Sequence, residues 1–163
     1  MTVTHPFSPL FDAGSEILIL GSFPSVASRE NRFFYGHPQN RFWKMLSLIY
    51  GEPLPYSTEE KRGLILRHHL ALYDVVFSCE ITGSADSSIR NVVPSDLSPV
   101  LCRSAIRKII VNGKTAEKYY RKYQEPTLGF SAICLPSTSP ANAAFSLDTL
   151  VKLWGKELTR GGG

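Results

Sequence analysis

Four short apolar runs, each followed by a polar loop and then by a helical pattern, constrain the fold of this chain most strongly. The runs are residues 17–20, 72–77, 109–111 and 132–135, and they are rich in Ile, Val and Leu. Strands buried on both faces of a parallel sheet have this composition. Strands that alternate with helices are joined by right-handed crossovers that cover both faces of the sheet. We therefore predict an α/β fold: a three-layer α/β/α sandwich around a four-stranded parallel sheet.

Helical patterns occupy the segments between and after these runs. Residues 41–50 place Phe42 and Leu46 on one apolar face, and Gly51 follows as a typical helix end. Ser57 and Glu60 have the spacing of a capping box, in which each side chain accepts a hydrogen bond from the other residue's backbone N–H. The predicted helices are 41–50, 57–69, 97–103, 115–123 and 147–158.

The composition fits a single domain over residues 1–163, with the glycines at 161–163 set aside as a tail. Hydrophobic residues make up 43% of the chain and charged residues 20%, which argues against a disordered protein. The chain has 18 Lys and Arg against 14 Asp and Glu, a net charge of +4. This excess permits a polyanionic partner such as DNA, although many proteins without one carry as much.

Three widely spaced cysteines, Cys79, Cys102 and Cys134, form no CxxC pair, so the sequence predicts no metal site and no metal cofactor. The first twelve residues contain no apolar segment of the kind found in signal peptides. No apolar stretch approaches the roughly 20 residues of a membrane span. We therefore expect a cytoplasmic protein, without a membrane partner, that acts as a monomer.

Polar and glycine-rich loops follow the four predicted strands at residues 21–25, 79–87, 112–115 and 136–142. Open parallel sheets bind ligands beyond the carboxyl ends of their strands, where such loops converge. The sequence therefore predicts one cleft at this edge of the sheet.

Three other classes of site have weaker support in these loops. Residues 112–115 resemble the end of a phosphate-binding loop, but Lys108 stands where that loop requires a glycine, so we read a strand-to-helix turn. Lys114 remains a candidate for a DNA phosphate contact. No GxSxG motif supports a serine hydrolase. A glycoside hydrolase needs a pair of acids, and Glu80 and Asp86 are the only carboxylates in the predicted edge loops.

Residues 33–43 combine aromatic and hydrogen-bonding side chains just before a predicted helix. An aromatic ring can stack on a flat base, and an amide can orient a water molecule without titrating. Asn40 has two interpretations at this point: it caps the helix, or it positions a water molecule. Phe42 and Trp43 begin the apolar face of the helix and are predicted core residues.

This combination resembles the uracil-DNA glycosylase superfamily over about residues 15–158. Gly-His-Pro-Gln-Asn-Arg-Phe-Trp-Lys at 36–44 is similar to the His-Pro-x-Asn-Arg-Phe-Trp-Lys stretch of the mismatch-specific uracil-DNA glycosylases. Residues 21–25 and 135–142 fall where the superfamily has its first and second motifs. Phe23 replaces the water-positioning Asn of the mismatch-specific enzymes, and Ser137-Thr138-Ser139-Pro140 replaces their Asn-Pro-Ser-Gly.

Gly-Ser-Phe-Pro-Ser together with His-Pro-Gln-Asn is closest to the hypoxanthine-DNA glycosylase branch. The resemblance implies that Asn40 positions water, that Tyr35 stacks on the flipped base, and that backbone amides near Phe23 meet the base edge. It also places Ala141 where relatives carry a bulky wedge. The predicted residues are Asn40 for catalysis; Gly21, Ser22, Phe23 and Tyr35 for the base; Ser25, Lys114, Ser137, Thr138, Ser139, Ala141 and Asn142 for DNA; and His37, Ser84 and Asp86 in support.

The resemblance implies a monofunctional DNA glycosylase that hydrolyses the bond to a deaminated base, hypoxanthine first, in single- or double-stranded DNA. No lysine in residues 23–40 is available to form a Schiff base. Two alternatives remain at this point. One is removal of uracil from mismatches, and the other is a nucleic-acid-binding domain without catalysis.

Overall fold

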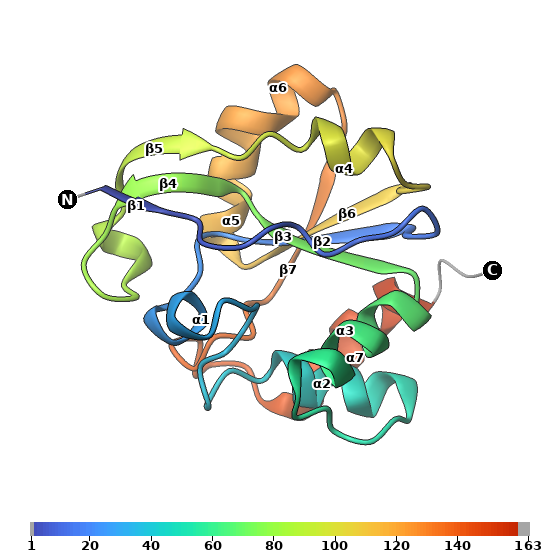
Figure 1. Ribbon diagram of the computed structural model, residues 1–163. Helices are drawn as coiled ribbons and strands as arrows, with labels where there is room; N and C mark the ends of the chain where they lie inside the picture. The colour runs from blue at the N-terminus through green and yellow to red at the C-terminus, as the bar shows by residue number, and fades with distance from the viewer. Residues whose placement is uncertain (1, 160–163) are drawn as a thin grey trace.

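The computed structural model describes residues 2–159, and its centre is a four-stranded parallel sheet in the order β3-β2-β6-β7 (Figure 1). The strands are β2 (Ile17–Gly21), β3 (Leu70–Asp74), β6 (Lys108–Asn112) and β7 (Ala132–Leu135). Leu18, Ile19 and Leu20 of β2 are fully buried, as expected for a strand covered on both faces. The predicted parallel sheet is confirmed.

Helices lie on both faces of this sheet, which confirms the three-layer arrangement (Figure 1). Apolar stripes hold the layers together, and Phe42, Tyr120 and Trp154 are among the largest fully buried side chains. One face carries α1 (Val26–Asn31), α2 (Phe42–Tyr50), α3 (Thr58–Arg67) and α7 (Leu147–Thr159), and the other carries α4 (Ser98–Cys102), α5 (Lys114–Tyr119), the π-helix η2 (Tyr120–Gln124) and α6 (Glu125–Leu128).

The single strand predicted at residues 72–77 is wrong, because the chain changes sheets within it. β3 ends at Asp74, and the backbone N–H groups of Val75 and Val76 then bond the carbonyl oxygens of Gly21 and Ser22 at 2.8 and 3.0 Å. Beyond this crossing, β4 (Val76–Glu80) pairs antiparallel with β1 (Thr2–Thr4) and β5 (Arg90–Pro94). Sequence reasoning also missed α1 and the short 3₁₀ helix η1 (Asp86–Ser88).

Some helix ends lie where the sequence predicted them, and others do not. The Ser57–Glu60 capping box is present, with both side-chain bonds formed. α2 begins one residue later than predicted, and its N-cap is Arg41 instead of Asn40. The helix predicted at 115–123 is interrupted by the π-helix η2.

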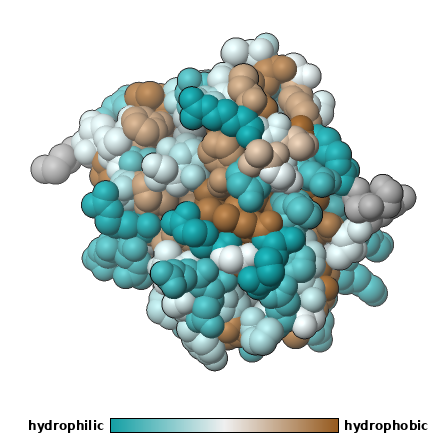
Figure 2. Space-filling view, turned by 45° about the vertical axis from the view of Figure 1, so that its right-hand side comes forward, coloured by the Kyte–Doolittle hydropathy of each residue, from teal (hydrophilic) through white to brown (hydrophobic). Residues whose placement is uncertain are grey.

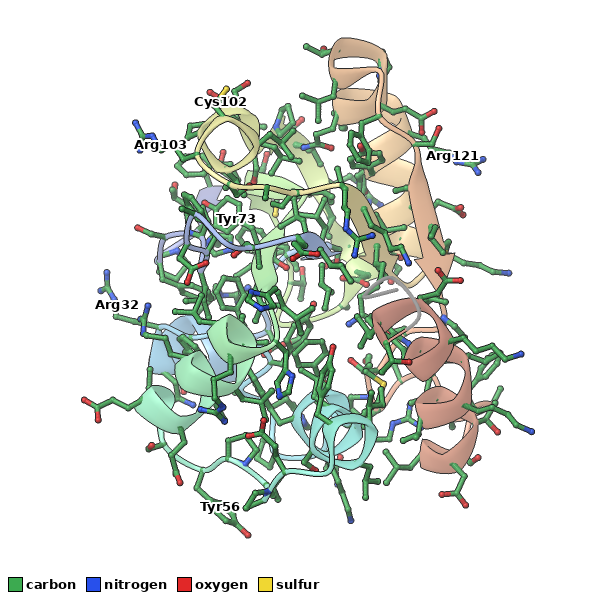
Figure 3. The ribbon with its side chains drawn as sticks, turned by 90° about the vertical axis from the view of Figure 1, so that its right-hand side faces the viewer. Arg32, Tyr56, Tyr73, Cys102, Arg103 and Arg121 are labelled. Atoms are coloured by element: carbon green, nitrogen blue, oxygen red, sulfur yellow. The ribbon has the colours of Figure 1, made fainter. Side chains whose placement is uncertain are left out.

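The surface is polar at its edges, with hydrophobic residues at the centre of the face shown in Figure 2. Arg32, Arg103 and Arg121 extend outward, whereas Tyr73 lies in the interior (Figure 3). No helix within residues 2–159 is long and apolar enough to cross a membrane. Within the same range, no group of three His, Cys, Asp or Glu side chains could hold a metal ion.

Candidate active site

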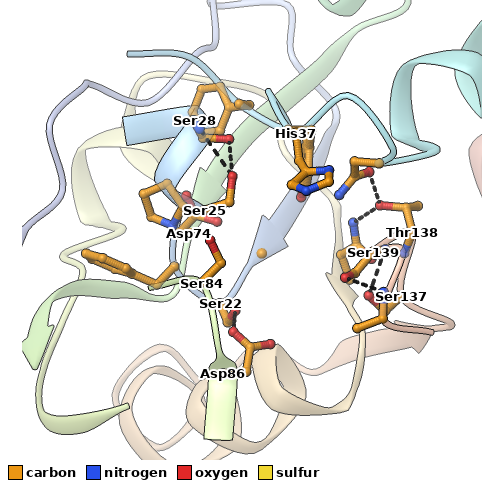
Figure 4. A pocket seen from close by; sticks show the side chains of 18 of the residues that line it. Ser22, Ser25, Ser28, His37, Asp74, Ser84, Asp86, Ser137, Thr138 and Ser139 are labelled. Carbon is orange, nitrogen blue, oxygen red and sulfur yellow. Dashed lines mark hydrogen bonds between the residues drawn. The ribbon is translucent and has the colours of Figure 1, made fainter. Parts of the chain in front are cut away.

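The loops that follow β2, β4 and β7 and the segment before α2 meet the ends of β3 and β6 around a pocket of about 260 Å³. Two walls are visible in Figure 4, one with Ser22, Asp74 and Asp86, and the other with His37 and Thr138. Every predicted site residue lines this pocket except Lys114 and Asn142. The lining also includes residues that were not predicted, namely Pro24, Ser28, Phe34, Asp74, Asn112 and Pro140.

The loops after β6 and β7 approach each other closely beside the pocket, at Gly113 and Ser137. Gly113 has φ of 96°, and a Cβ there would lie 2.9 Å from the Cβ of Ser137. A glycine is therefore required both by the backbone conformation and by the contact. Lys114 follows as the first residue of α5 and is exposed outside the pocket, so its predicted phosphate contact stays a prediction.

The Asn40 side chain is fixed by two donors. Its Oδ1 accepts hydrogen bonds from the backbone N–H of Phe42 at 3.0 Å and from the Thr138 hydroxyl at 2.9 Å. Because the backbone N–H can only donate, the atom facing it must be the oxygen, which settles the orientation of the amide. Asn40 thus supports the first turn of α2 from one residue before the N-cap, and its Nδ2 has no bonding partner within residues 2–159.

Thr138 connects Asn40 to the end of β6. Its hydroxyl accepts a hydrogen bond from Asn112 Nδ2 at 3.1 Å, and its backbone N–H donates to Asn112 Oδ1 at 3.0 Å (Figure 4). The residue is completely buried. Its side chain is buried and bonded to protein atoms, and the predicted contact of Thr138 with DNA stays a prediction.

Arg41 braces the loop after β7 from the residue next to Asn40. Its guanidinium donates to the carbonyl oxygens of Ser139 at 2.8 Å and Asn142 at 2.9 Å, and also to that of Phe145. Its backbone N–H donates to the Thr138 carbonyl oxygen at 3.1 Å. Sequence reasoning gave Arg41 no such role, although an arginine next to a loop that lacks regular structure is suited to bind several carbonyl groups.

Several backbone groups of residues 137–142 are hydrogen-bonded within this segment, which leaves fewer groups free for the predicted contacts with DNA. The N–H groups of Ser139 and Ala141 bond the hydroxyl oxygens of Ser137 and Ser139, each at 3.1 Å. Asn142 Nδ2 bonds the Ser137 carbonyl oxygen at 3.0 Å. The Ser137 and Ser139 hydroxyl hydrogens therefore remain as donors, and Ala141 presents only an exposed methyl group.

The loop after β2 forms the facing wall. Ser22 donates to Asp86 Oδ1 at 2.9 Å, and Ser84 accepts from the backbone N–H of Val26 at 2.8 Å. Desolvation by the pocket wall raises the pKa of the Asp86 carboxyl, and the Ser22 hydrogen bond opposes that shift. Ser25 caps α1, with its hydroxyl oxygen accepting from the backbone N–H of Ser28.

Tyr35, His37 and Phe23 complete the walls. The Tyr35 ring stacks on Phe42 with centroids 4.1 Å apart, and its hydroxyl is buried without a partner in the described chain. His37 accepts from the Gln39 N–H at 3.1 Å, and its carbonyl oxygen accepts from the Asn40 N–H at 2.9 Å, which shapes the turn that presents Asn40. Phe23 is 8% exposed and lines the pocket.

A buried hydrogen-bonded pair at the pocket was not predicted. Asp74 ends β3 opposite Gly21, and its Oδ2 lies 2.7 Å from Nε2 of His5. Both residues are buried. The single strand predicted over 72–77 hid the change of sheets at Asp74 and its position at the ligand-binding edge.

Comparison with known proteins identifies the family. The family model of the uracil DNA glycosylase superfamily matches residues 8–156. The chain belongs to the uracil-DNA glycosylase superfamily. The predicted resemblance is therefore confirmed.

Relatives within the superfamily cover almost the whole chain. A hypoxanthine DNA glycosylase of Methanosarcina acetivorans is 37% identical over 88% of this chain and 91% of its own length. A hypoxanthine DNA glycosylase of Methanosarcina barkeri is 33% identical over 83% of this chain and 86% of its own length. A solution NMR structure from M. acetivorans, provisionally named a uracil DNA glycosylase, has a TM-score of 0.82 and 30% identity over 98% of each chain. The fold of this chain is thus that of the superfamily throughout.

Proposed function

We propose that this protein is a monofunctional DNA glycosylase that hydrolyses the N-glycosidic bond of a flipped-out deaminated base, with hypoxanthine preferred. Membership of the superfamily and two relatives named hypoxanthine DNA glycosylase support this function. The substrate is DNA containing the damaged base, in a double or single strand, and the second reactant is water. Flipping delivers the base into the pocket, at a lower energetic cost when its pairing is weak.

The Asn40 amide is the observation that carries the proposal. Both acceptor positions of its Oδ1 are taken by Phe42 and Thr138, so its free Nδ2–H can donate to the oxygen of a water molecule. A water held in this way keeps a lone pair for attack on the anomeric carbon of the sugar. The amide acts by placing the water, and a fixed position of the reacting atoms lowers the activation barrier for hydrolysis.

The lining of the pocket supports hydrolysis over covalent catalysis. A glycosylase that forms a Schiff base needs an amine at the anomeric carbon. Among residues 2–159, no lysine lines the pocket. Positive charge that develops on the sugar can be balanced by the phosphates of the DNA itself, so a carboxylate nucleophile is not required.

The test uses identical duplexes that carry inosine, uracil, xanthine or adenine at one position. After incubation, alkali cleaves abasic sites, and single-turnover rates are measured. We expect inosine to be cleaved fastest and adenine not at all. Faster cleavage of uracil would favour the alternative of a uracil-DNA glycosylase, and DNA retardation on a gel without abasic sites would leave only a binding domain.

Three variants assign the chemistry to Asn40. Asn40→Ala should slow the single-turnover rate by roughly 100-fold or more, because a small misplacement of reacting atoms costs that much. Asn40→Asp keeps an oxygen for Phe42 and Thr138 but exchanges the free donor for an acceptor, so it should melt like the wild type and still be slow. Gln39→Ala, an exposed position in the same turn, is the matched control. A folded Asn40→Ala protein within about threefold of the wild-type rate would refute the assignment.

A further inference from the structure

The Asp86 carboxyl group lies at the mouth of the pocket and has no role in the mechanism above. The residue is exposed, and it lines the pocket on the wall that faces His37 and Thr138 (Figure 4). Its Oδ1 accepts a hydrogen bond from the Ser22 hydroxyl at 2.9 Å. No basic side chain within residues 2–159 forms an ion pair with it. A carboxyl group in a ligand pocket without a cationic partner is a candidate for proton transfer.

The loop that carries Asp86 is fastened to helix α1. The guanidinium of Arg29 donates to the Gly83 carbonyl oxygen at 3.0 Å, and the Ser84 hydroxyl accepts from the Val26 N–H at 2.8 Å. Asp86 follows as the first residue of the 3₁₀ helix η1. A fixed backbone therefore presents the carboxyl group to the pocket, and proton transfer requires such a fixed position because the acid must lie within hydrogen-bond reach of its target.

The surroundings of Asp86 favour its neutral form. Desolvation by the pocket wall and the negative charge of Asp74 raise the pKa of Asp86, whereas hydrogen bonds to its oxygens oppose the shift. Two further titratable groups interact with it, Cys79 of β4 and Tyr119 of α5, and neither carries a positive charge. A base that enters the pocket displaces water from the carboxyl group, which disfavours the carboxylate further. Asp86 is thus suited to hold a proton in the complex.

The position of Asp86 matches one part of a flipped purine nucleotide. The sugar and its phosphates stay outside the pocket, so the five-membered ring, which carries the glycosidic nitrogen N9, lies nearest the mouth. Attacking water and departing base occupy opposite faces of the anomeric carbon. Water held by Asn40, which is bonded to Thr138 on one wall, therefore directs the base toward the facing wall. Asp86 lies on that wall and at the mouth.

We propose that Asp86 is a general acid that donates its proton to N7 of the departing purine. N7 belongs to the same five-membered ring as N9, so a proton on N7 neutralises the charge that develops as the glycosidic bond breaks. Uracil has no corresponding nitrogen and leaves as an anion, so this role is specific to purines. The inference deepens the proposed function and depends on it, because it names a second catalytic residue and a purine as the substrate.

The proton balance of this step is complete without a further reactant. A lone pair of the water oxygen forms the bond to the anomeric carbon, and the electron pair of the glycosidic bond passes to N9. The Asp86 carboxylic acid gives its proton to N7, so hypoxanthine leaves as a neutral molecule. The attacking water releases one proton to the solvent, and the Asp86 carboxylate takes one up from the solvent after the base has left.

The first test separates the rate of cleavage from DNA affinity. Asp86→Asn keeps an oxygen for the Ser22 hydroxyl but has no acidic proton. We expect its single-turnover rate on inosine duplexes to fall by roughly 100-fold or more, because general acid catalysis contributes at least about that much. Its Kd for a duplex with the 2′-fluoro analogue of inosine, whose glycosidic bond resists hydrolysis, should stay within about threefold of the wild-type value.

Asp96→Asn is the matched control, because this exposed carboxylate lies outside the pocket and accepts a bond from the Ser98 N–H. It should leave both the rate and the Kd unchanged. A folded Asp86→Asn protein within about threefold of the wild-type rate on inosine would overturn the role of Asp86 and leave the proposed function intact. An equal loss of rate on uracil DNA, which has no N7, would overturn the assignment of the proton to the purine.

A second measurement uses the pH dependence of the wild-type rate, which a merely structural role of Asp86 would not produce. On inosine DNA the single-turnover rate should fall by about tenfold per pH unit above the pKa of Asp86 in the complex, while the Kd of the 2′-fluoro duplex changes little. The residual rate of Asp86→Asn should lack this slope. A wild-type rate that is constant from about pH 5 to about pH 9 would overturn the proposal. Wild-type protein that leaves no abasic sites in inosine DNA would instead refute the proposed function, and the role of Asp86 with it.

Discussion

Replacing Thr138 with valine tests whether the buried hydroxyl positions Asn40. The substitution preserves the branched shape of the side chain and removes two hydrogen bonds, one to Asn40 Oδ1 at 2.9 Å and one from Asn112 Nδ2 at 3.1 Å. Leaving buried polar groups such as the Asn112 amide without a partner costs about 1–3 kcal/mol. For a chain of this length, that loss corresponds to a melting temperature lowered by about 2–12 °C.

The effect on the reaction should exceed the effect on binding. Asn40 retains only its bond from the backbone of Phe42, so the amide is free to turn and misplace the water. We expect the single-turnover rate on inosine DNA to fall by roughly 10- to 100-fold. DNA affinity should remain close to that of the wild type, because Thr138 is fully buried and its hydroxyl makes no contact with solvent.

Thr138→Ser supplies the control, since it keeps the hydroxyl and removes only a methyl group. Its rate should stay within about threefold of the wild type, with a small loss of stability from the missing methyl. Melting temperature, duplex affinity and single-turnover rate are measured for all three proteins. If Thr138→Val is folded and as fast as Thr138→Ser, the hydroxyl does not position Asn40. A lower DNA affinity with an unchanged rate would instead support the predicted role of Thr138 in binding DNA.

Four further outcomes follow from the geometry. Gly21→Ala should lower the rate by about 10-fold or more, because its Cβ would displace the Asp74 carboxylate 2.4 Å away; single-turnover kinetics on a variant checked by circular dichroism measure this. Arg41→Gln should weaken DNA affinity and make residues 138–145 more sensitive to limited proteolysis, since the carbonyl groups of that loop lose their brace. DNA affinity should fall with salt, by about 0.9 in log–log slope for each neutralised phosphate of duplex DNA, and a slope near zero would contradict phosphate binding. The raised pKa of Asp86 means that the folded state binds its proton more tightly than the unfolded state, so stability decreases as pH rises through the folded pKa. Asp86→Asn should therefore be more stable than the wild type at pH 7 and lose that advantage below the ordinary carboxyl pKa of about 4. Denaturant unfolding at both pH values measures the difference.

The sequence predicted the layers and the position of the pocket because both depend on local patterns. The strands at 17–20 and 132–135 are uniform apolar runs, although only the first is buried throughout and the second, at the edge of the sheet, exposes Ile133. The capping box at Ser57 is a contact between near neighbours. The loops after parallel strands converge through topology alone. The fold class and the edge of the sheet that carries the pocket therefore follow from local patterns in the sequence.

The parts that were missed depend on contacts between distant segments. The run at 72–77 is apolar throughout except for Asp74, and nothing local distinguishes one strand from two that join different sheets. His5 meets Asp74 across 69 residues of sequence, and Thr138 meets Asn40 across 98. Asp74 was the available signal for the floor of the pocket, because it is a charged residue within an apolar run. It lies opposite Gly21, where the neighbouring strand ends.

Residues 40 and 41 both bind the loop that follows β7, one through the Thr138 hydroxyl and the other through carbonyl groups as far as Phe145. The start of α2 and this loop consequently form one exchangeable module. A graft of the loop alone from another branch of the superfamily would leave the Arg41 guanidinium without matched acceptors and Asn40 without its second donor. Chimaeras designed to alter DNA contacts should therefore transfer both segments together, and natural variation at the two places is expected to be correlated.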